Sequence, residues 1–207
     1  MSGPVEPPSH AFDASVLPSY VFGPRSMMWW GTMGIVLIES TVFALAIVSY
    51  FYLRTKNAEW PPGVAPPVLL WGTLNTAIML LSGIPNEWVR RIAKKEDLRK
   101  IRIGLVVCLV FAAAFLALRA VEFANLNVRW DTNAYGSIVW LLLGLHTVHL
   151  ITDVLDTAVL TVLMYTGPLE GKRYVDVSEN AEYWWFVMLA WLPIYAVIYL
   201  VPRGWPS

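Results

Sequence analysis

Five long runs of mostly apolar residues, separated by short polar or proline-rich stretches, dominate the chain. A helix needs roughly 20 apolar residues to cross a bilayer core about 30 Å thick. The runs must be helices, since a lipid-facing strand would leave backbone groups unpaired, and the alternating ten-residue segments of a barrel are missing. The pattern predicts an all-α integral membrane bundle of five transmembrane helices at 27–53, 67–84, 101–125, 135–165 and 183–201.

Proline residues mark several of the predicted boundaries. Pro85 is expected to close the second span and Pro202 the fifth, because proline breaks a helix or ends it. Residues 1–26 are predicted to form a proline-rich cytoplasmic tail, and residues 202–207 a short external C-terminus. The tail lacks the basic-then-apolar order of a secretory signal, so the first span is expected to be retained.

Composition agrees with a lipid environment. Apolar residues make up 57% of the chain and charged residues 14%, against roughly 45–50% and about 25% in soluble domains. The net charge is zero, which argues against nucleic acid as a partner. Cys108 is the single cysteine and lies in an apolar run, so it is interpreted as an inert buried thiol.

The basic residues predict the orientation of the bundle. Four of them would lie on one side of the membrane: Arg54, Lys56, Arg129 and Arg203. Ten would lie on the other: Arg25, Arg90, Arg91, Lys94, Lys95, Arg99, Lys100, Arg102, Lys172 and Arg173. Because cytoplasmic loops carry the excess of Lys and Arg, the N-terminus is predicted to be cytoplasmic and the C-terminus periplasmic.

Ionisable side chains inside the predicted spans are the candidate functional residues, because each costs about 2.5–3.5 kcal/mol or more to insert. Glu39 lies midway along the first span. It could be a neutral hydrogen-bonded carboxyl, or serve in proton transfer or lipid anchoring. Arg119 and Glu122 are three residues apart near the outer end of the third span. They share a helix face and are predicted to form an ion pair.

The densest polar cluster lies in the fourth span. His146, His149, Asp153 and Asp156 fall on one stripe at 3.6 residues per turn. Such a stripe could be satisfied by hydrogen bonds within the bundle, relay protons, or bind a metal. A metal would need a further ligand from another helix, for which Glu39 or Glu122 is a candidate. All three interpretations remain open from the residues alone.

Motifs of redox and hydrolytic chemistry are missing from the sequence. It contains no CxxCH, no CxxC pair, no phosphate-binding P-loop and no GxSxG element. His146 and His149 share one helix face, so they could not sandwich a haem iron. We therefore predict no catalytic residue, no cofactor-binding residue and no metal ligand in this chain, and expect its chemistry to lie in a partner.

Short motifs between Trp30 and Tyr199 occur in a familiar order. They are Glu39-Ser40-Thr41-Val42-Phe43, Trp60-Pro61-Pro62-Gly63, Leu74-Asn75-Thr76, Glu122-Phe123, Tyr135-Gly136-Ser137, Gly144-Leu145-His146-Thr147-Val148-His149 and Tyr183-Trp184 with Trp191. Through them the chain resembles subunit III of the haem-copper oxidases (the cytochrome c oxidase subunit 3 family), in its short bacterial form with five helices.

The chain departs from that family's pattern at several positions. Trp185 stands where the last-helix motif usually has His, and Met188 where it usually has Asp. Asp153 and Asp156 stand where small or apolar residues are expected. A polar contact is thus expected to be lost on the fifth helix and an acidic pair gained on the fourth.

The resemblance implies a non-catalytic accessory subunit of a respiratory terminal oxidase in a bacterial inner membrane. Haem and copper are expected in partner subunit I, and copper in subunit II if the enzyme is a cytochrome c oxidase. The subunit would dock beside subunit I, hold phospholipid in a cleft between its first two spans and the rest, and support proton uptake. Its lipid- or proton-associated residues would be Glu39, Glu122, His146, His149, Asp153 and Asp156.

Three alternatives are kept beside this interpretation. The chain could be an accessory subunit of a nitric oxide reductase, which would share the architecture. It could be a proton-coupled membrane transporter that conducts along the stripe from His146 to Asp156, although five spans without an inverted repeat argue against this. The third is a metal-dependent membrane enzyme that uses His146, His149 and Asp153.

Overall fold

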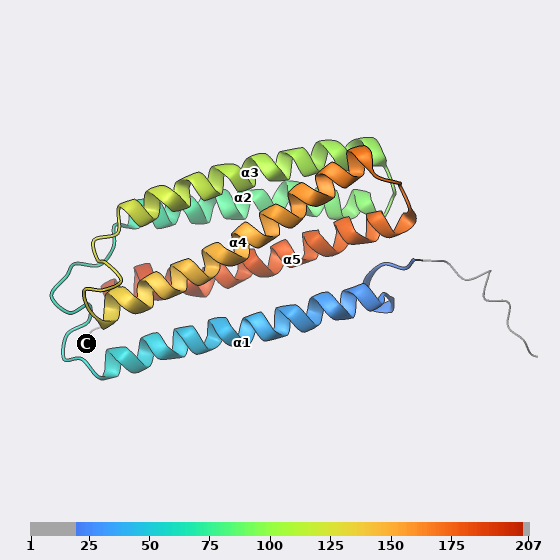
Figure 1. The fold of residues 1–207 in the computed structure, drawn as a ribbon. Helices are drawn as coiled ribbons and strands as arrows, with labels where there is room; N and C mark the ends of the chain where they lie inside the picture. Colours follow the sequence, from blue (N-terminus) through green and yellow to red (C-terminus); the bar gives the residue numbers. More distant parts are fainter. Residues whose placement is uncertain (1–19, 205–207) are drawn as a thin grey trace, which may run out of the picture.

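The computed structural model describes residues 20–204. Most of the predicted tail and the last residues of the predicted C-terminus therefore lie outside the described residues. Five long helices make up the fold (Figure 1): α1 Met27–Thr55, α2 Leu69–Ala93, α3 Leu98–Ala124, α4 Ala134–Thr166 and α5 Gly171–Tyr195. A short 3₁₀ turn, η2 Gly23–Arg25, precedes α1, while a π-helical turn, η3 Ala196–Leu200, and α6 Val201–Gly204 prolong α5. The prediction of a helical membrane bundle is confirmed.

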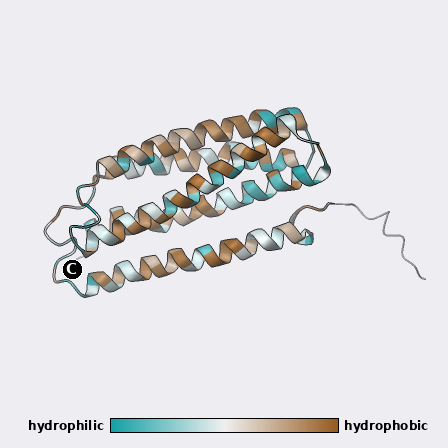
Figure 2. Cartoon of the chain, in the orientation of Figure 1, coloured by the Kyte–Doolittle hydropathy of each residue, from teal (hydrophilic) through white to brown (hydrophobic). Residues whose placement is uncertain are grey.

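Four helices are long and apolar enough to cross a membrane: α1, α3, α4 and the continuous helix Gly171–Gly204. Apolar residues cover most of their length, and polar residues gather toward the bundle ends (Figure 2). α2 differs because it carries the buried polar residues Asn75, Ser82 and Asn86. Its polar groups bond to neighbouring helices rather than face lipid. The expectation of a fifth span, which came from the length of an apolar run, is not among the four that the described helices support and stays a prediction.

Local side chains begin three of the helices. The Ser26 hydroxyl accepts from the Met28 backbone N–H at 3.2 Å, Asp97 accepts from Lys100 at 3.2 Å, and Asn133 accepts from Gly136 at 2.8 Å. Each bond satisfies one of the N–H groups that a helix start leaves without an intrahelical partner. The turns before α1, α3 and α4 are thus encoded locally.

Pro85 does not close the second helix, so that expectation was wrong. α2 continues for eight residues to Ala93, with Pro85 inside it. The continuation presents Asn86, Val89, Ile92 and Ala93 as a buried face. Packing of this face against α3 and α5, together with a 2.8 Å bond from the Asn86 amide to the Ala181 carbonyl, offsets the hydrogen bond that proline cannot make.

The expected loop before the fifth span is also largely helical. α5 begins at Gly171 and not near Tyr183. The loop expected at 86–102 shrinks to a tight turn, because its two ends belong to α2 and α3. Hydropathy marks only the lipid-facing stretch of a helix. Charged helical turns that project from the membrane fall outside it, as do polar turns buried against other helices.

The packing of the helices divides the chain unequally. α2 packs against α3 and α5, α3 also packs against α4, and α1 packs mainly against α4 and α5. Figure 1 shows α1 along one side of the other four helices. Of its 29 residues, Phe43, Ala46 and Tyr50 are the buried ones. Among the described residues, α1 and α2 pack mainly against other helices and not against each other.

Two glycines allow α2 to approach its neighbours. A Cβ on Gly72 would overlap the ring of Tyr199 on the α5 extension, and a Cβ on Gly104 of α3 would overlap Val89 of α2. Both positions need the smallest residue because the partner side chain is buried. The close contact of α2 with α3 and α5 depends on these two sites.

Candidate functional site

A buried ion pair lies where α2, α3, α4 and the α5 extension meet. Arg119 Nη1 and Glu122 Oε2 are 2.7 Å apart, and each side chain is 1% exposed. The Asn75 amide donates to Glu122 Oε2 at 2.5 Å, and the Tyr199 hydroxyl donates to Glu122 Oε1. The Arg119 guanidinium also stacks 4.1 Å from the Trp191 ring centroid. Side chains from several helices thus meet at one carboxylate and one guanidinium. A buried ion pair needs such partners, because each charge has lost its contact with water.

His146 completes this buried cluster. Its Nε2 is 3.1 Å from the Val187 carbonyl, and its Nδ1 is 3.3 Å from Arg119 Nη2. A carbonyl only accepts and a guanidinium only donates. Nε2 therefore carries the proton and Nδ1 accepts, which describes a neutral imidazole with both nitrogens used.

Glu39 lies in a different setting, facing α4 and α5. Its Oε2 accepts from the Tyr183 hydroxyl at 2.7 Å, and its Oε1 is 3.5 Å from His149 Nε2. The Glu39 side chain is 23% exposed and the His149 side chain 12%. Phe43 covers His149, with ring centroids 4.8 Å apart. This trio is half-buried, whereas the cluster around Glu122 is sealed.

The second ring nitrogen of His149 limits how the imidazole can contact Glu39. His149 Nδ1 is 2.7 Å from the Leu145 carbonyl, so Nδ1 must donate. A bond between Nε2 and Glu39 then needs one further proton, carried either by the carboxyl or by the imidazole. Glu39 Oε1 and His149 Nε2 thus face each other at 3.5 Å without a further donor between them.

A groove of about 680 Å³ leads from one end of the bundle to Glu39, between α1, α4 and α5. Met28, Ile35, Val159, Leu160 and Leu163 form its apolar part. Its polar lining consists of Thr32, Glu39, Thr152, Asp153, Asp156, Arg173, Asp176, Glu179, Asn180 and Tyr183. The groove separates α1 from α4 and α5, and not the first two helices from the rest as the resemblance implied.

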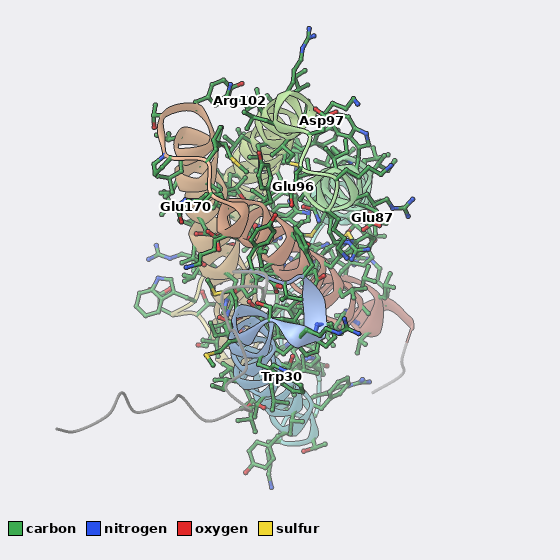
Figure 3. The ribbon with its side chains drawn as sticks, turned by 90° about the vertical axis from the view of Figure 1, so that its right-hand side faces the viewer. Trp30, Glu87, Glu96, Asp97, Arg102 and Glu170 are labelled. Atoms are coloured by element: carbon green, nitrogen blue, oxygen red, sulfur yellow. The ribbon has the colours of Figure 1, made fainter. Side chains whose placement is uncertain are left out.

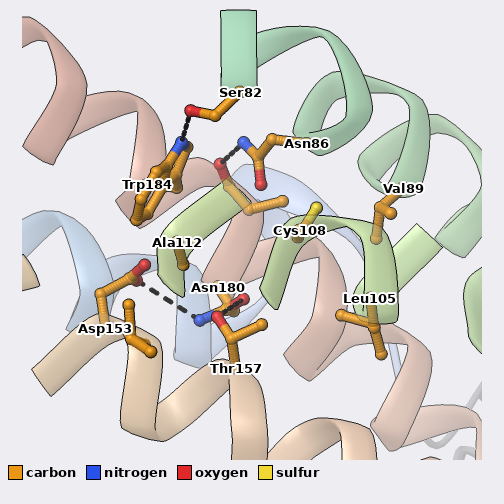
Figure 4. Close-up of a pocket in the computed structure, with 12 residues that line it drawn as sticks. Ser82, Asn86, Val89, Leu105, Cys108, Ala112, Asp153, Thr157, Asn180 and Trp184 are labelled. Carbon is orange, nitrogen blue, oxygen red and sulfur yellow. Dashed lines mark hydrogen bonds between the residues drawn. The ribbon is translucent and has the colours of Figure 1, made fainter. Parts of the chain in front are cut away.

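Asp153 and Asp156 share one donor from α5. The Asn180 amide lies 3.0 Å from Asp156 Oδ2 and 3.4 Å from Asp153 Oδ1. Asp153 is buried, while Asp156 faces outward. Asp153 and Asn180 also line a small internal cavity of about 20 Å³ with Asn86, Cys108 and Trp184 (Figure 4). That volume accommodates about one water molecule, so these two residues separate the groove from a polar pocket in the core.

The stripe predicted on α4 is therefore divided among separate networks. His146 reaches the ion pair, His149 reaches Glu39, and the two aspartates reach Asn180. Among residues 20–204, no group of three or more His, Cys, Asp or Glu side chains has a geometry that could hold a metal ion. All four residues make hydrogen bonds within the bundle in this structure.

Three groove residues escaped the sequence-based reasoning: Asp176, Glu179 and Asn180. They were assigned to a loop because their stretch is too polar for a span. Their spacing, continued to Tyr183, places them on one helix face, and this signal could have indicated an earlier start for α5.

A fourth polar group lies at the rim, near the α2–α3 turn. Glu87 accepts from Arg90 Nε and from Arg91 Nε, both at 2.7 Å. These bonds, that of Arg90 first, lower the pKa of Glu87 from 4.5 to about 2, although partial burial opposes the shift. Charged side chains crowd this end of the molecule, as the view onto Glu87, Glu96, Asp97, Arg102 and Glu170 shows (Figure 3).

These features define a multi-pass helical membrane protein with polar clusters inside its bundle. The family model for cytochrome c oxidase subunit III matches residues 15–203. The chain therefore belongs to the cytochrome c oxidase subunit III family, and the resemblance inferred from its motifs is confirmed.

Individual relatives cover the chain to different extents. Cytochrome c oxidase subunit 3 of Thermostichus vulcanus is 24% identical over 84% of this chain and 87% of its own length. The protein of the same name from Pylaiella littoralis is 30% identical over 81% of this chain and 65% of its own length. The haem-copper oxidase subunit I+III of Aeropyrum pernix is 29% identical over 86% of this chain, which corresponds to 22% of that protein. The chain thus spans just under two thirds of the Pylaiella relative.

Proposed function

We propose that the chain is a non-catalytic accessory subunit of a respiratory haem-copper oxidase in a bacterial inner membrane. The observation that carries this proposal is the match of residues 15–203 to the subunit III family. The haem and copper would be held by subunit I, with copper also in subunit II if the electron donor is cytochrome c. In the Aeropyrum relative the name joins subunits I and III in one chain, which supports subunit I as the main contact.

In this proposal α2 is a fifth membrane span, the N-terminus is cytoplasmic and the C-terminus periplasmic. α2 runs along α3 and α5, and its polar groups Asn75, Ser82 and Asn86 have partners inside the bundle. Buried polar groups paired in this way carry little further cost in lipid. The turns that carry the basic residues of 90–102 and 172–173 meet at the same end as the start of α1 (Figure 1), as the positive-inside rule requires.

The second part of the proposal is that the Glu39 groove holds lipid and supports proton uptake. The Glu39 carboxyl accepts from the Tyr183 hydroxyl and lies 3.5 Å from His149 Nε2 at the inner end of the groove, and in this proposal it is the group that takes up a proton. The groove has both an apolar wall and a carboxyl-rich wall. Such a site can exchange protons with the membrane surface, which the sealed Glu122 cluster cannot do.

Purification of the tagged chain from its native membranes tests this function. The expected result is copurification with a large multi-span partner and a reduced-minus-oxidised spectrum with haem bands. A colourless preparation that contains this chain alone would contradict the accessory role and favour a transporter, which flux through proteoliposomes would then test. A nitric oxide reductase partner in place of an oxidase would correct the assignment of the enzyme.

A further inference from the structure

The small internal cavity is enclosed by side chains from α2, α3, α4 and α5. Its volume is about 20 Å³, and a cavity needs roughly 10–15 Å³, measured with a water-sized probe, to hold one water molecule. Its polar lining consists of Ser82, Asn86, Cys108, Asp153, Thr157, Asn180 and Trp184. The cavity is therefore large enough for one water molecule and too small for a larger ligand.

Most hydrogen-bond donors of the cavity wall are already used. The Ser82 hydroxyl donates to a backbone carbonyl of its own helix at 2.6 Å, and the Trp184 indole donates to Ser82 at 3.0 Å. The Thr157 hydroxyl donates to the side-chain oxygen of Asn180 at 3.1 Å. Among the described lining residues, the Cys108 thiol is the donor that remains, and an S–H group is a weak donor.

Two acceptors in the same wall are poorly served. The Asn86 amide donates to the Ala181 carbonyl at 2.8 Å, which leaves the side-chain oxygen of Asn86 facing the cavity (Figure 4). Asp153 is 3% exposed, and the Asn180 amide reaches its Oδ1 at 3.4 Å, beyond the usual range of about 2.7–3.2 Å. Because a buried acceptor without a good donor is costly, this wall favours a ligand that donates.

Other small ligands fit these residues less well. An anion would need a positive group, and neither Lys nor Arg is among the described residues that line the cavity. A metal ion would need several ligands, and residues 20–204 hold no suitable group of three His, Cys, Asp or Glu side chains. A water molecule is uncharged and both donates and accepts, and buried water typically makes about three hydrogen bonds. It matches a wall with two open acceptors and one thiol.

We propose that one water molecule occupies this cavity and joins Asp153 of α4 to Asn86 of α2. It donates one hydrogen bond to each of these side chains and accepts one from the Cys108 thiol. The main neighbours of α2 are α3 and α5, and those of α4 are α1, α3 and α5. The water therefore links two helices that have no extensive contact of their own. This site goes beyond the proposed function, since it depends on the packing of this chain alone.

A cryo-EM map of the intact complex that resolves ordered water tests the site. One peak is expected within hydrogen-bond distance of both Asn86 Oδ1 and the Asp153 carboxyl. Asp153→Asn keeps an oxygen acceptor and should keep the peak, whereas Asp153→Val removes the acceptor and should lose it. The matched control is Asp156→Asn, because Asp156 shares the donor Asn180 but does not line the cavity. An empty cavity in the wild type, a peak that contacts one of the two residues, or a peak that persists in Asp153→Val would overturn the proposal.

An infrared spectrum gives a second readout, which holds even if Asp153→Val does not assemble. The S–H stretching band of Cys108 is isolated by subtracting the spectrum of a Cys108→Ala complex. The wild-type band is expected at the lower frequency of a hydrogen-bonded thiol, and Asp156→Asn should leave it unchanged. A wild-type band at the frequency of a free thiol would contradict the water site. Copurification with a haem-bearing partner does not depend on this result, so the proposed function is tested separately.

Discussion

Two regions of the bundle use the same chemical groups in opposite ways. Around Glu122, a carboxylate, a guanidinium, a tyrosine and a histidine are sealed among four helices, and the carboxylate and imidazole are fully engaged. Around Glu39, a carboxyl, a tyrosine and a histidine stand at the inner end of an open groove. The first arrangement fixes the positions of the helices relative to one another, because separating a buried charge from its partners is costly. The second is open to the groove, and its carboxyl and imidazole are 23% and 12% exposed.

The largest expected effect comes from breaking the sealed pair. Glu122→Ala would leave the Arg119 guanidinium buried without its carboxylate, and loss of one partner of a buried pair costs about 3–5 kcal/mol. We expect little assembled complex and a much lower thermal midpoint. The control is Asp131→Ala, which removes the exposed pair of Arg129 and Asp131 and should change stability by about 0–1 kcal/mol. Equal stability of the two variants would show that the buried ion pair contributes no more to stability than an exposed one.

The packing of α2 against α3 gives the next largest effect. Gly104→Ala adds a methyl group that meets Val89 and Trp88, and overpacking costs typically about 1–3 kcal/mol. Gly34→Ala on α1 meets nothing within 4 Å, so helix propensity alone acts there and favours alanine by up to about 1 kcal/mol. Thermal unfolding of both complexes measures the contrast. Similar midpoints for the two variants would show that α2 and α3 can separate at no cost.

The groove should respond in activity and not in stability. Glu39→Gln keeps the shape of the side chain and its contact with Tyr183, so we expect normal assembly and a stability loss below about 1 kcal/mol. Because an amide cannot take up a proton as a carboxylate does, the proposed role of Glu39 in proton uptake predicts that turnover of the oxidase complex falls. Glu59→Gln is the control at an exposed acid. Turnover equal to that of the control would argue that Glu39 is purely structural.

The smallest effect is expected at the rim. The pKa of Glu87 is lowered to about 2 in the folded chain, so its ionised form stabilises the fold above its ordinary pKa of 4.5. That contribution is lost as the pH falls from about 4.5 to about 2. Glu87→Gln should therefore be less stable than wild type near neutral pH and equally stable near pH 2. Denaturation curves across this range check the sign, and curves that diverge as the pH falls would contradict it.

Much of the fold is predictable because lipid imposes simple rules. Four apolar helices, the pairing of residues 119 and 122 at helical spacing, and the family itself follow from residues close together or from motif order. Pro85 and the start of α5 were misjudged for one reason. Both lie where polar residues are buried by other helices, as Asn86 and Asn180 are, and hydropathy cannot distinguish burial against protein from exposure to water.

What the sequence determined by itself is the class of the protein, through long apolar runs and ordered motifs. Only the tertiary structure decided how its polar residues are grouped. His146 and His149 are three residues apart, yet one faces Arg119 and the other Glu39. Glu39 and Tyr183, 144 residues apart in the chain, share a hydrogen bond. Helix periodicity places a side chain on a face, but the identity of the facing helix depends on the packing of the whole bundle.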